Sequence, residues 1–134
     1  MIRKRTTKGQ SLAEFGLILP LILLLVFGFL DMGRAVYYYS AIGNAAREGA
    51  RYASVRPLDL QTAGSTDIDD VRTVVQDYAV SVGLDADKIT FPAAPTEDYV
   101  TVKIVYDFVP ITPFVNTLTL NAETTMLLAP IARQ

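Results

Sequence analysis

The longest apolar run in the chain lies close to its N-terminus. Residues 15–30 read FGLILPLILLLVFGFL and carry no charge. Extended back to Gln10, the segment has 21 residues. In α-helical form it is about 31 Å long, against about 30 Å for the hydrocarbon core of a bilayer. The pattern predicts a membrane-spanning helix. The alternative, a buried core helix, needs more apolar surface around it than a chain of 134 residues provides.

The charges on either side of the span predict its orientation. Arg3, Lys4, Arg5 and Lys8 precede it with no acid among them, and Asp31 follows it. Because basic flanks stay in the cytoplasm, everything after about residue 31 is expected outside it. A cleaved secretory signal also begins with basic residues. Its apolar core is usually about 7–15 residues long and precedes a small-x-small cleavage site, and this segment shows neither feature.

The helical pattern continues beyond the span. Residues 32–55 contain no proline and are rich in alanine, and Pro57 disfavours helix at Arg56. A helix from Gln10 to about Val55 is about 69 Å long. Pro20 lies inside it, removes one backbone hydrogen bond and is expected to bend it, which a membrane helix tolerates.

Small residues recur four positions apart in the distal part of this helix. Such spacing lets another helix approach closely. The partner is either the chain's own domain or an identical or related helix in an assembly, and one helix can serve both. The residues expected to pack in this way are Ala45, Ala46, Gly49, Ala50 and Ala53.

The remaining sequence predicts a small α+β domain. After a loop at 57–66, a one-sided apolar stripe from Ile68 to Val82, which includes Tyr78, predicts a helix ended by Gly83. Alternating patterns then predict strands at 88–91, 99–108 and 117–128. The fold class is therefore α+β and pilin-like: one long N-terminal helix, then a helix packed on an antiparallel sheet of about three strands. The expected divisions are 1–9, a basic leader; 10–56, the transmembrane and extended helix; and 57–134, the extracytoplasmic domain.

Composition excludes several classes of function. Residues 57–134 carry eleven acids against four basic residues, which disfavours nucleic-acid binding. The chain has no Cys and no His. It also has no nucleophile–base pair, metal-ligand cluster or phosphate-binding loop. We therefore expect no enzyme activity, no catalytic, cofactor-binding or metal-binding residues, and no cofactor.

The start of the helix resembles a type IV pilin leader. Lys8 to Phe15 read KGQSLAEF, in which a glycine is followed after four residues by a glutamate and then by an apolar helix. The resemblance implies cleavage by a prepilin peptidase between Gly9 and Gln10, which makes Glu14 the fifth residue of the mature chain.

A longer stretch is similar to TadE-like proteins. It covers residues 9–54, including the mid-span proline, Asp-x-Gly-Arg at 31–34 and NAAREGAR at 44–51, and again residues 102–126. Residues 57–97 show no specific match. The resemblance implies a minor pilin or pseudopilin of the tight-adherence system. It also implies the prepilin peptidase and other pilin subunits, including copies of this chain, as partners besides membrane lipid.

Glu14 is the only charged residue between Lys8 and Asp31. An ionised side chain deep in a bilayer costs about 2.5–3.5 kcal/mol, and less near its edge. The pilin resemblance gives Glu14 an assembly role, pairing with the amine that cleavage creates on a neighbour's Gln10. In the alternative, Glu14 lies at the level of the lipid headgroups and has no role in assembly.

Two functions remain open at this point. The first is a cleaved subunit that assembles through its N-terminal helix into a pilus or a pilus-assembly complex. The second is a permanently anchored, extracytoplasmic binding module that never enters a filament. Both place the protein in the inner membrane as a single-pass protein with its N-terminus in the cytoplasm, and the first also allows a place in an extracellular pilus. Tyr37, Tyr38 and Tyr39 are expected to form an aromatic belt at the membrane surface.

Overall fold

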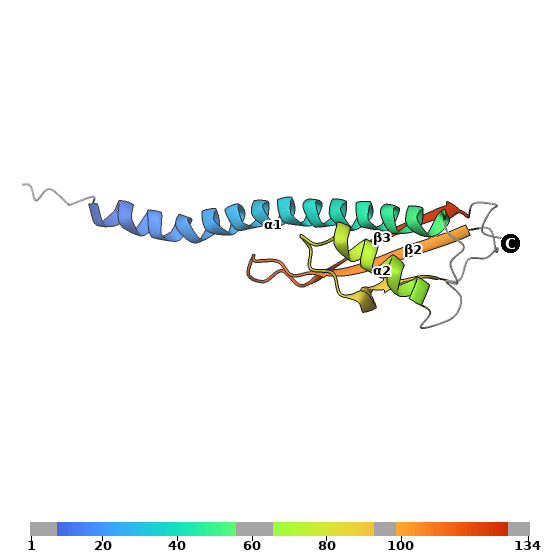
Figure 1. The fold of residues 1–134 in the computed structure, drawn as a ribbon. Helices are drawn as coiled ribbons and strands as arrows, with labels where there is room; N and C mark the ends of the chain where they lie inside the picture. Colours follow the sequence, from blue (N-terminus) through green and yellow to red (C-terminus); the bar gives the residue numbers. More distant parts are fainter. Residues whose placement is uncertain (1–7, 56–65, 93–98, 129–134) are drawn as a thin grey trace, which may run out of the picture.

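The computed structural model describes residues 8–55, 66–92 and 99–128. One long helix carries a small head formed by a second helix and an antiparallel sheet (Figure 1). The predicted α+β class is confirmed. Of the predicted loop at 57–66, residues 57–65 lie outside the described residues, and Thr66 is already the first residue of the second helix.

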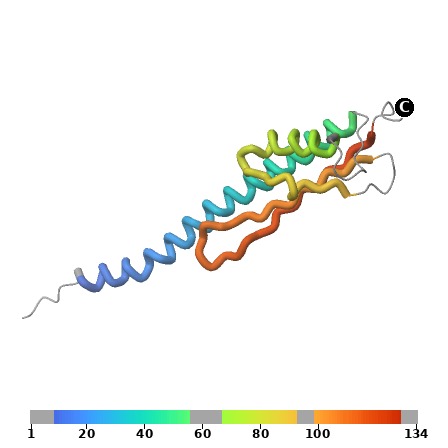
Figure 2. The backbone as a smooth tube through the Cα atoms, turned by 60° about the horizontal axis from the view of Figure 1, so that its bottom comes forward, coloured from blue at the N-terminus to red at the C-terminus, as the bar shows by residue number. Residues whose placement is uncertain are grey.

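Helix α1 runs from Lys8 to Ser54 and continues through Pro20. Near its end the Ser54 hydroxyl donates a hydrogen bond of 2.9 Å to the carbonyl of Arg51. The N-terminal half projects from the head as a bare helix, and the C-terminal half packs against the second helix and the sheet (Figures 1 and 2). The predicted single helix, running from the apolar segment into the domain, is confirmed.

The sheet has the order β1-β2-β3, and both of its strand pairs are antiparallel. Strands β2, Tyr99–Phe108, and β3, Leu118–Leu127, pair along their whole length. Strand β1 is shorter than predicted and contains only Ile89–Thr90. The preceding residues form a 3₁₀ turn, η1 (Ala86–Lys88), because the amide of Lys88 donates to the carbonyl of Asp85 at 3.1 Å.

Helix α2 spans Thr66–Tyr78 and ends earlier than the apolar stripe predicted. After it the bonding tightens: the amide of Val82 donates to the carbonyl of Ala79, three residues back. Gly83 follows in a left-handed conformation with φ of +65°. The stripe is buried at Ala79 and Val82 all the same, but Tyr78, which belongs to the same stripe, is 56% exposed and lies outside the core.

The core lies between α1, α2 and one face of the sheet. Every second residue of β2 points into it, and α1 contributes small side chains that let the elements approach closely. The other face of the sheet is largely polar, with the hydroxyls of Thr101 and Thr125 2.9 Å apart across β2 and β3. The strand residues in the core are Ile89, Val100, Val102, Ile104 and Ala122.

Candidate functional site

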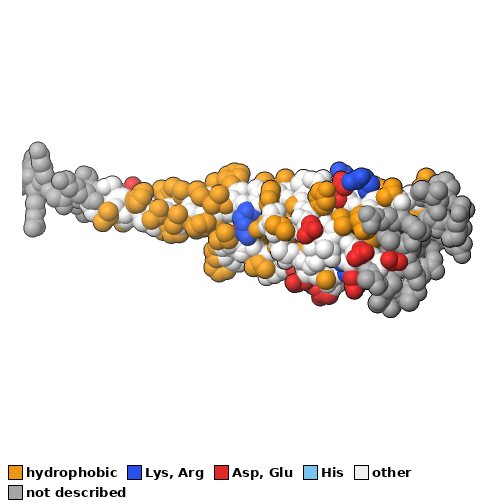
Figure 3. All heavy atoms as spheres, in the orientation of Figure 1, with side chains coloured by type: hydrophobic (Ala, Val, Ile, Leu, Met, Phe, Trp, Pro, Cys, Tyr) orange, Lys and Arg blue, Asp and Glu red, His pale blue; other side chains and the backbone are white. Residues whose placement is uncertain are grey.

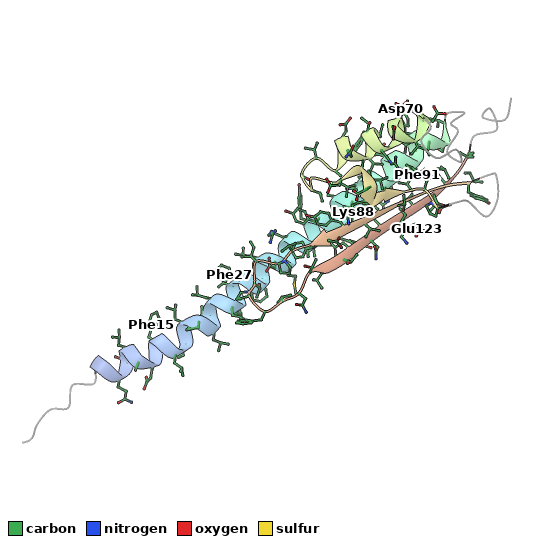
Figure 4. All side chains as sticks on the ribbon, turned by 90° about the horizontal axis from the view of Figure 1, so that it is seen from below. Phe15, Phe27, Asp70, Lys88, Phe91 and Glu123 are labelled. Carbon is green, nitrogen blue, oxygen red and sulfur yellow. The ribbon has the colours of Figure 1, made fainter. Side chains whose placement is uncertain are left out.

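The apolar part of α1 is uncovered by any other described element. Large side chains from Leu12 to Leu30 are exposed in all directions around the helix. Phe15 and Phe27 point away from the helix into empty space (Figure 4). By length and composition α1 is the one helix in the described part of the chain that can cross a membrane. Exposed apolar surface on this scale requires lipid or other helices around it.

Gly9, Gln10 and Glu14 lie at the exposed beginning of α1. The Gln10 side-chain amide donates a 3.1 Å hydrogen bond to Oε1 of Glu14, one helical turn further on. The structure therefore brings the predicted new N-terminal residue and the lone carboxylate together on one helix face. No other described element lies near enough to Gly9 to restrict access to it.

The five small residues predicted for helix packing lie inside the chain's own head. Ala45, Ala46, Ala50 and Ala53 are fully buried, and Gly49 is buried with them. A side-chain carbon added at Gly49 would collide with Cγ2 of Val75 on α2. In this structure these residues have no surface left for a second helix. The part of α1 that remains open to neighbours is the apolar segment.

A buried carboxylate lies where the apolar segment meets the head. Asp31 is only 7% exposed and accepts hydrogen bonds from the loop between β2 and β3. The Ile111 amide donates at 2.9 Å, and the Thr112 amide and hydroxyl each donate at 2.6 Å. Arg34 completes the set with an ion pair of 2.8 Å. These bonds tie the loop to α1 at the first residue after the span.

The sequence shows Asp31 and Arg34 three residues apart on one predicted helix, and the contact of Asp31 with the loop was not predicted. The bonding partners are 80 and 81 positions apart, which no local pattern reveals. One available signal was the proline on each side of Ile111 and Thr112, since two prolines rigidify a loop whose free amides need acceptors.

Arg34 also joins the aromatic side chains of the head. Its guanidinium lies 5.1 Å from the ring centre of Phe108 and 5.7 Å from that of Tyr38. Tyr38 makes edge-to-face contacts with Tyr106 and Phe108. Tyr38 therefore packs on the head and is not part of an outward belt. Of the three predicted belt residues, Tyr37 and Tyr39 are exposed.

The hydrogen bonds that Asp31 accepts lower the pKa of its carboxyl group from 3.8 to about 2. Burial by itself raises the pKa, but the hydrogen bonds from Ile111, Thr112 and Arg34 outweigh it. Between these pH values the unfolded chain binds the proton and the folded chain does not. The stabilisation is therefore complete above pH 3.8 and is lost as the pH falls towards about 2.

We expect the amide resonances of Ile111 and Thr112 to report this titration in the full-length chain in micelles. Their chemical shifts should change with a midpoint near pH 2, because protonation of Asp31 removes their acceptor. In Asp31→Asn the same resonances should not follow this titration. A wild-type midpoint at the ordinary value of 3.8 would show that the loop is not bound to the carboxylate.

A shallow groove of about 220 Å³ lies between α1 and β3. Its walls include Tyr39, Asn44 and Arg47 from α1, and Asn121 and Glu123 from β3. Within the described residues, no group of three His, Cys, Asp or Glu side chains is placed to hold a metal ion.

The fold and this junction define a class: an α+β head carried on a single helix that can cross a membrane. Residues 9–51 match the model of the family described as TadE-like protein, so this part of the chain is a TadE-like domain. The resemblance inferred from the sequence is confirmed over these residues, and it suggests a pilus-related protein. The comparisons with curated proteins and with solved structures give no match.

Proposed function

We propose that the chain is a pilin-like subunit of the TadE type, held in the inner membrane with its N-terminus in the cytoplasm and its head outside. A prepilin peptidase cleaves it after Gly9, and it assembles through α1 into a pilus or a pilus-assembly complex. The observation that carries the proposal is Glu14, a lone carboxylate on the uncovered part of α1, at the fifth position after Gly9.

Cleavage weakens the electrostatic interactions that hold the chain in the membrane. It removes Arg3, Lys4, Arg5 and Lys8, which takes the net charge from −2 to −6. The basic anchor on the cytoplasmic side is thereby lost. Cleavage creates the new amine on Gln10, whose side-chain amide contacts Glu14 in its own chain. In an assembly, the amine of a neighbouring subunit can approach the same exposed carboxylate.

The uncovered surface of α1 supports assembly through this segment. Apolar side chains surround the helix up to Leu30, and the next turns add exposed Met32 and Val36. When a subunit leaves the bilayer, this surface must exchange lipid for other apolar surface, because exposure to water costs about 25 cal/mol per Å². Matching helices of neighbouring subunits provide such a surface.

The proposal is tested by N-terminal sequencing of the chain, purified from cells with the prepilin peptidase and from cells without it. We expect a chain that begins at Gln10 in the first case and at Met1 in the second. Gly9→Leu should leave the leader in place in both strains, which controls for other proteases. An intact Met1 in both strains would refute processing and support the permanently anchored binding module.

A further inference from the structure

The loop between β2 and β3 presents an uncharged, apolar tip. No Asp, Glu, Lys or Arg occurs from Phe108 to Ala122. Phe114 at the tip is 98% exposed and has a φ of +73°, a left-handed conformation that bulky residues rarely adopt. The other large apolar side chains exposed on or beside the loop are Val109, Ile111, Val115 and Leu118.

The loop lies where the membrane span ends. Its Ile111 and Thr112 are bound to Asp31, the residue that follows the apolar segment. From there the loop points back along α1 towards the N-terminus (Figures 1 and 2). In the space-filling view the apolar side chains at this end of the head adjoin those of the bare helix (Figure 3). The two surfaces form one continuous apolar region.

Such a tip is unfavourable in water. A fully exposed aromatic side chain loses the free energy that burial provides, and here it stands in a backbone conformation that adds strain. Pro110 and Pro113 limit the freedom of the loop to fold the side chain away. Proteins expose apolar side chains in this way where a membrane or another protein covers them.

We propose that this loop rests in the outer interface of the bilayer, as a second membrane contact beside α1. The inference rests on the proposed membrane span. Its consequence is that the head is held at a fixed inclination to the membrane surface, since two points of contact restrict tilting and rotation that a single helix allows.

Lipid fits the loop better than a soluble partner does. The region lacks charge, adjoins the span and lies at the level of Asp31, with Tyr37 exposed about two turns further along α1. Amphipathic groups at this depth are typical of the membrane–water interface. The apolar segment of a second copy is the other surface that would fit, and the experiment separates the two.

The chain contains no tryptophan, so a single introduced tryptophan reports on one site. The full-length chain is reconstituted in vesicles of phosphatidylcholine with a minor share of phosphatidylglycerol. The phosphatidylcholine is brominated either near the ester bonds or near the chain ends. Phe114→Trp should be quenched by the shallow bromines more than by the deep ones. Tyr99→Trp, at the opposite end of β2, should not be quenched by either.

Phe27→Trp, within the span, separates failure of this inference from failure of the membrane span. If it is quenched and Phe114→Trp is not, the span stands and the loop contact is refuted. If neither is quenched, the span itself is refuted, and the loop contact with it. A blue-shifted, unquenched Phe114→Trp whose shift disappears as protein is diluted in lipid would assign the tip to a second copy and overturn the proposal.

Discussion

Replacing Glu14 with alanine is expected to leave the chain inserted in the membrane but to abolish its recovery with other pilin subunits. Removing an ionised group from the span lowers the insertion cost by up to about 2.5–3.5 kcal/mol, so anchoring should not suffer. Assembly should fail because the carboxylate that pairs with a neighbour's amine is gone. Pulldown of tagged chain from solubilised membranes, with sibling subunits as the readout, measures the effect.

Two variants control this experiment. Glu14→Gln keeps an oxygen that accepts the Gln10 hydrogen bond but loses the charge, so it should also fail if ionic pairing matters. Leu12→Ala removes a similarly exposed apolar side chain in the same helix and should keep most of the recovery. Recovery of Glu14→Ala at the wild-type level would count against the pairing.

The second large effect concerns stability. Gly49→Ala is expected to lower the free energy of unfolding of the head, although alanine favours helix by about 1 kcal/mol over glycine. The added methyl would collide with Cγ2 of Val75, a stiff β-branched side chain that is itself fully buried. Overpacking of this kind costs about 1–3 kcal/mol, so the net loss reaches up to about 2 kcal/mol.

Gly43→Ala is the matched control on the same helix. A methyl group at Gly43 meets nothing within 4 Å, so only the helix preference remains and stability should rise by up to about 1 kcal/mol. Urea unfolding of the full-length chain in micelles, followed by near-UV circular dichroism of its seven tyrosines, gives both values. Equal shifts in the two variants would mean that α2 does not pack against α1 at Gly49.

The elements that follow from local pattern were predictable from the sequence. The apolar run, the alanine-rich stretch without proline that follows it and the stop at Pro57 predicted the length of α1. Alternation of apolar and polar residues predicted the bounds of β2 as observed, Tyr99–Phe108. The end of α2 was predicted too late, because a turn with bonds to the third residue back buries the same apolar stripe as a helix does. Periodicity alone does not distinguish the two.

The two parts of the site also differ in how well the sequence predicts them. Gly9 and Glu14 are recognisable in the sequence because the motif that they form is a fixed spacing along one helix. The hydrogen bonds between Asp31 and Thr112 depend on how the β2–β3 hairpin folds back on α1. No local sequence pattern indicates this contact. The exposure of Phe114 was equally hidden, since an apolar residue in a loop gives no indication of whether the fold will cover it.

In the arrangement that we propose, α1 crosses the membrane once and carries the head outside. The chain has no cysteine, so single cysteines at Leu21 in the span and at exposed Val80 on the head can be tested with a membrane-impermeant maleimide. We expect Val80→Cys to be labelled in intact spheroplasts, and Leu21→Cys to remain unlabelled even after lysis until detergent is added. Labelling of Val80→Cys only after lysis would place the head inside the cell, and labelling of Leu21→Cys without detergent would show that the helix does not lie in the bilayer.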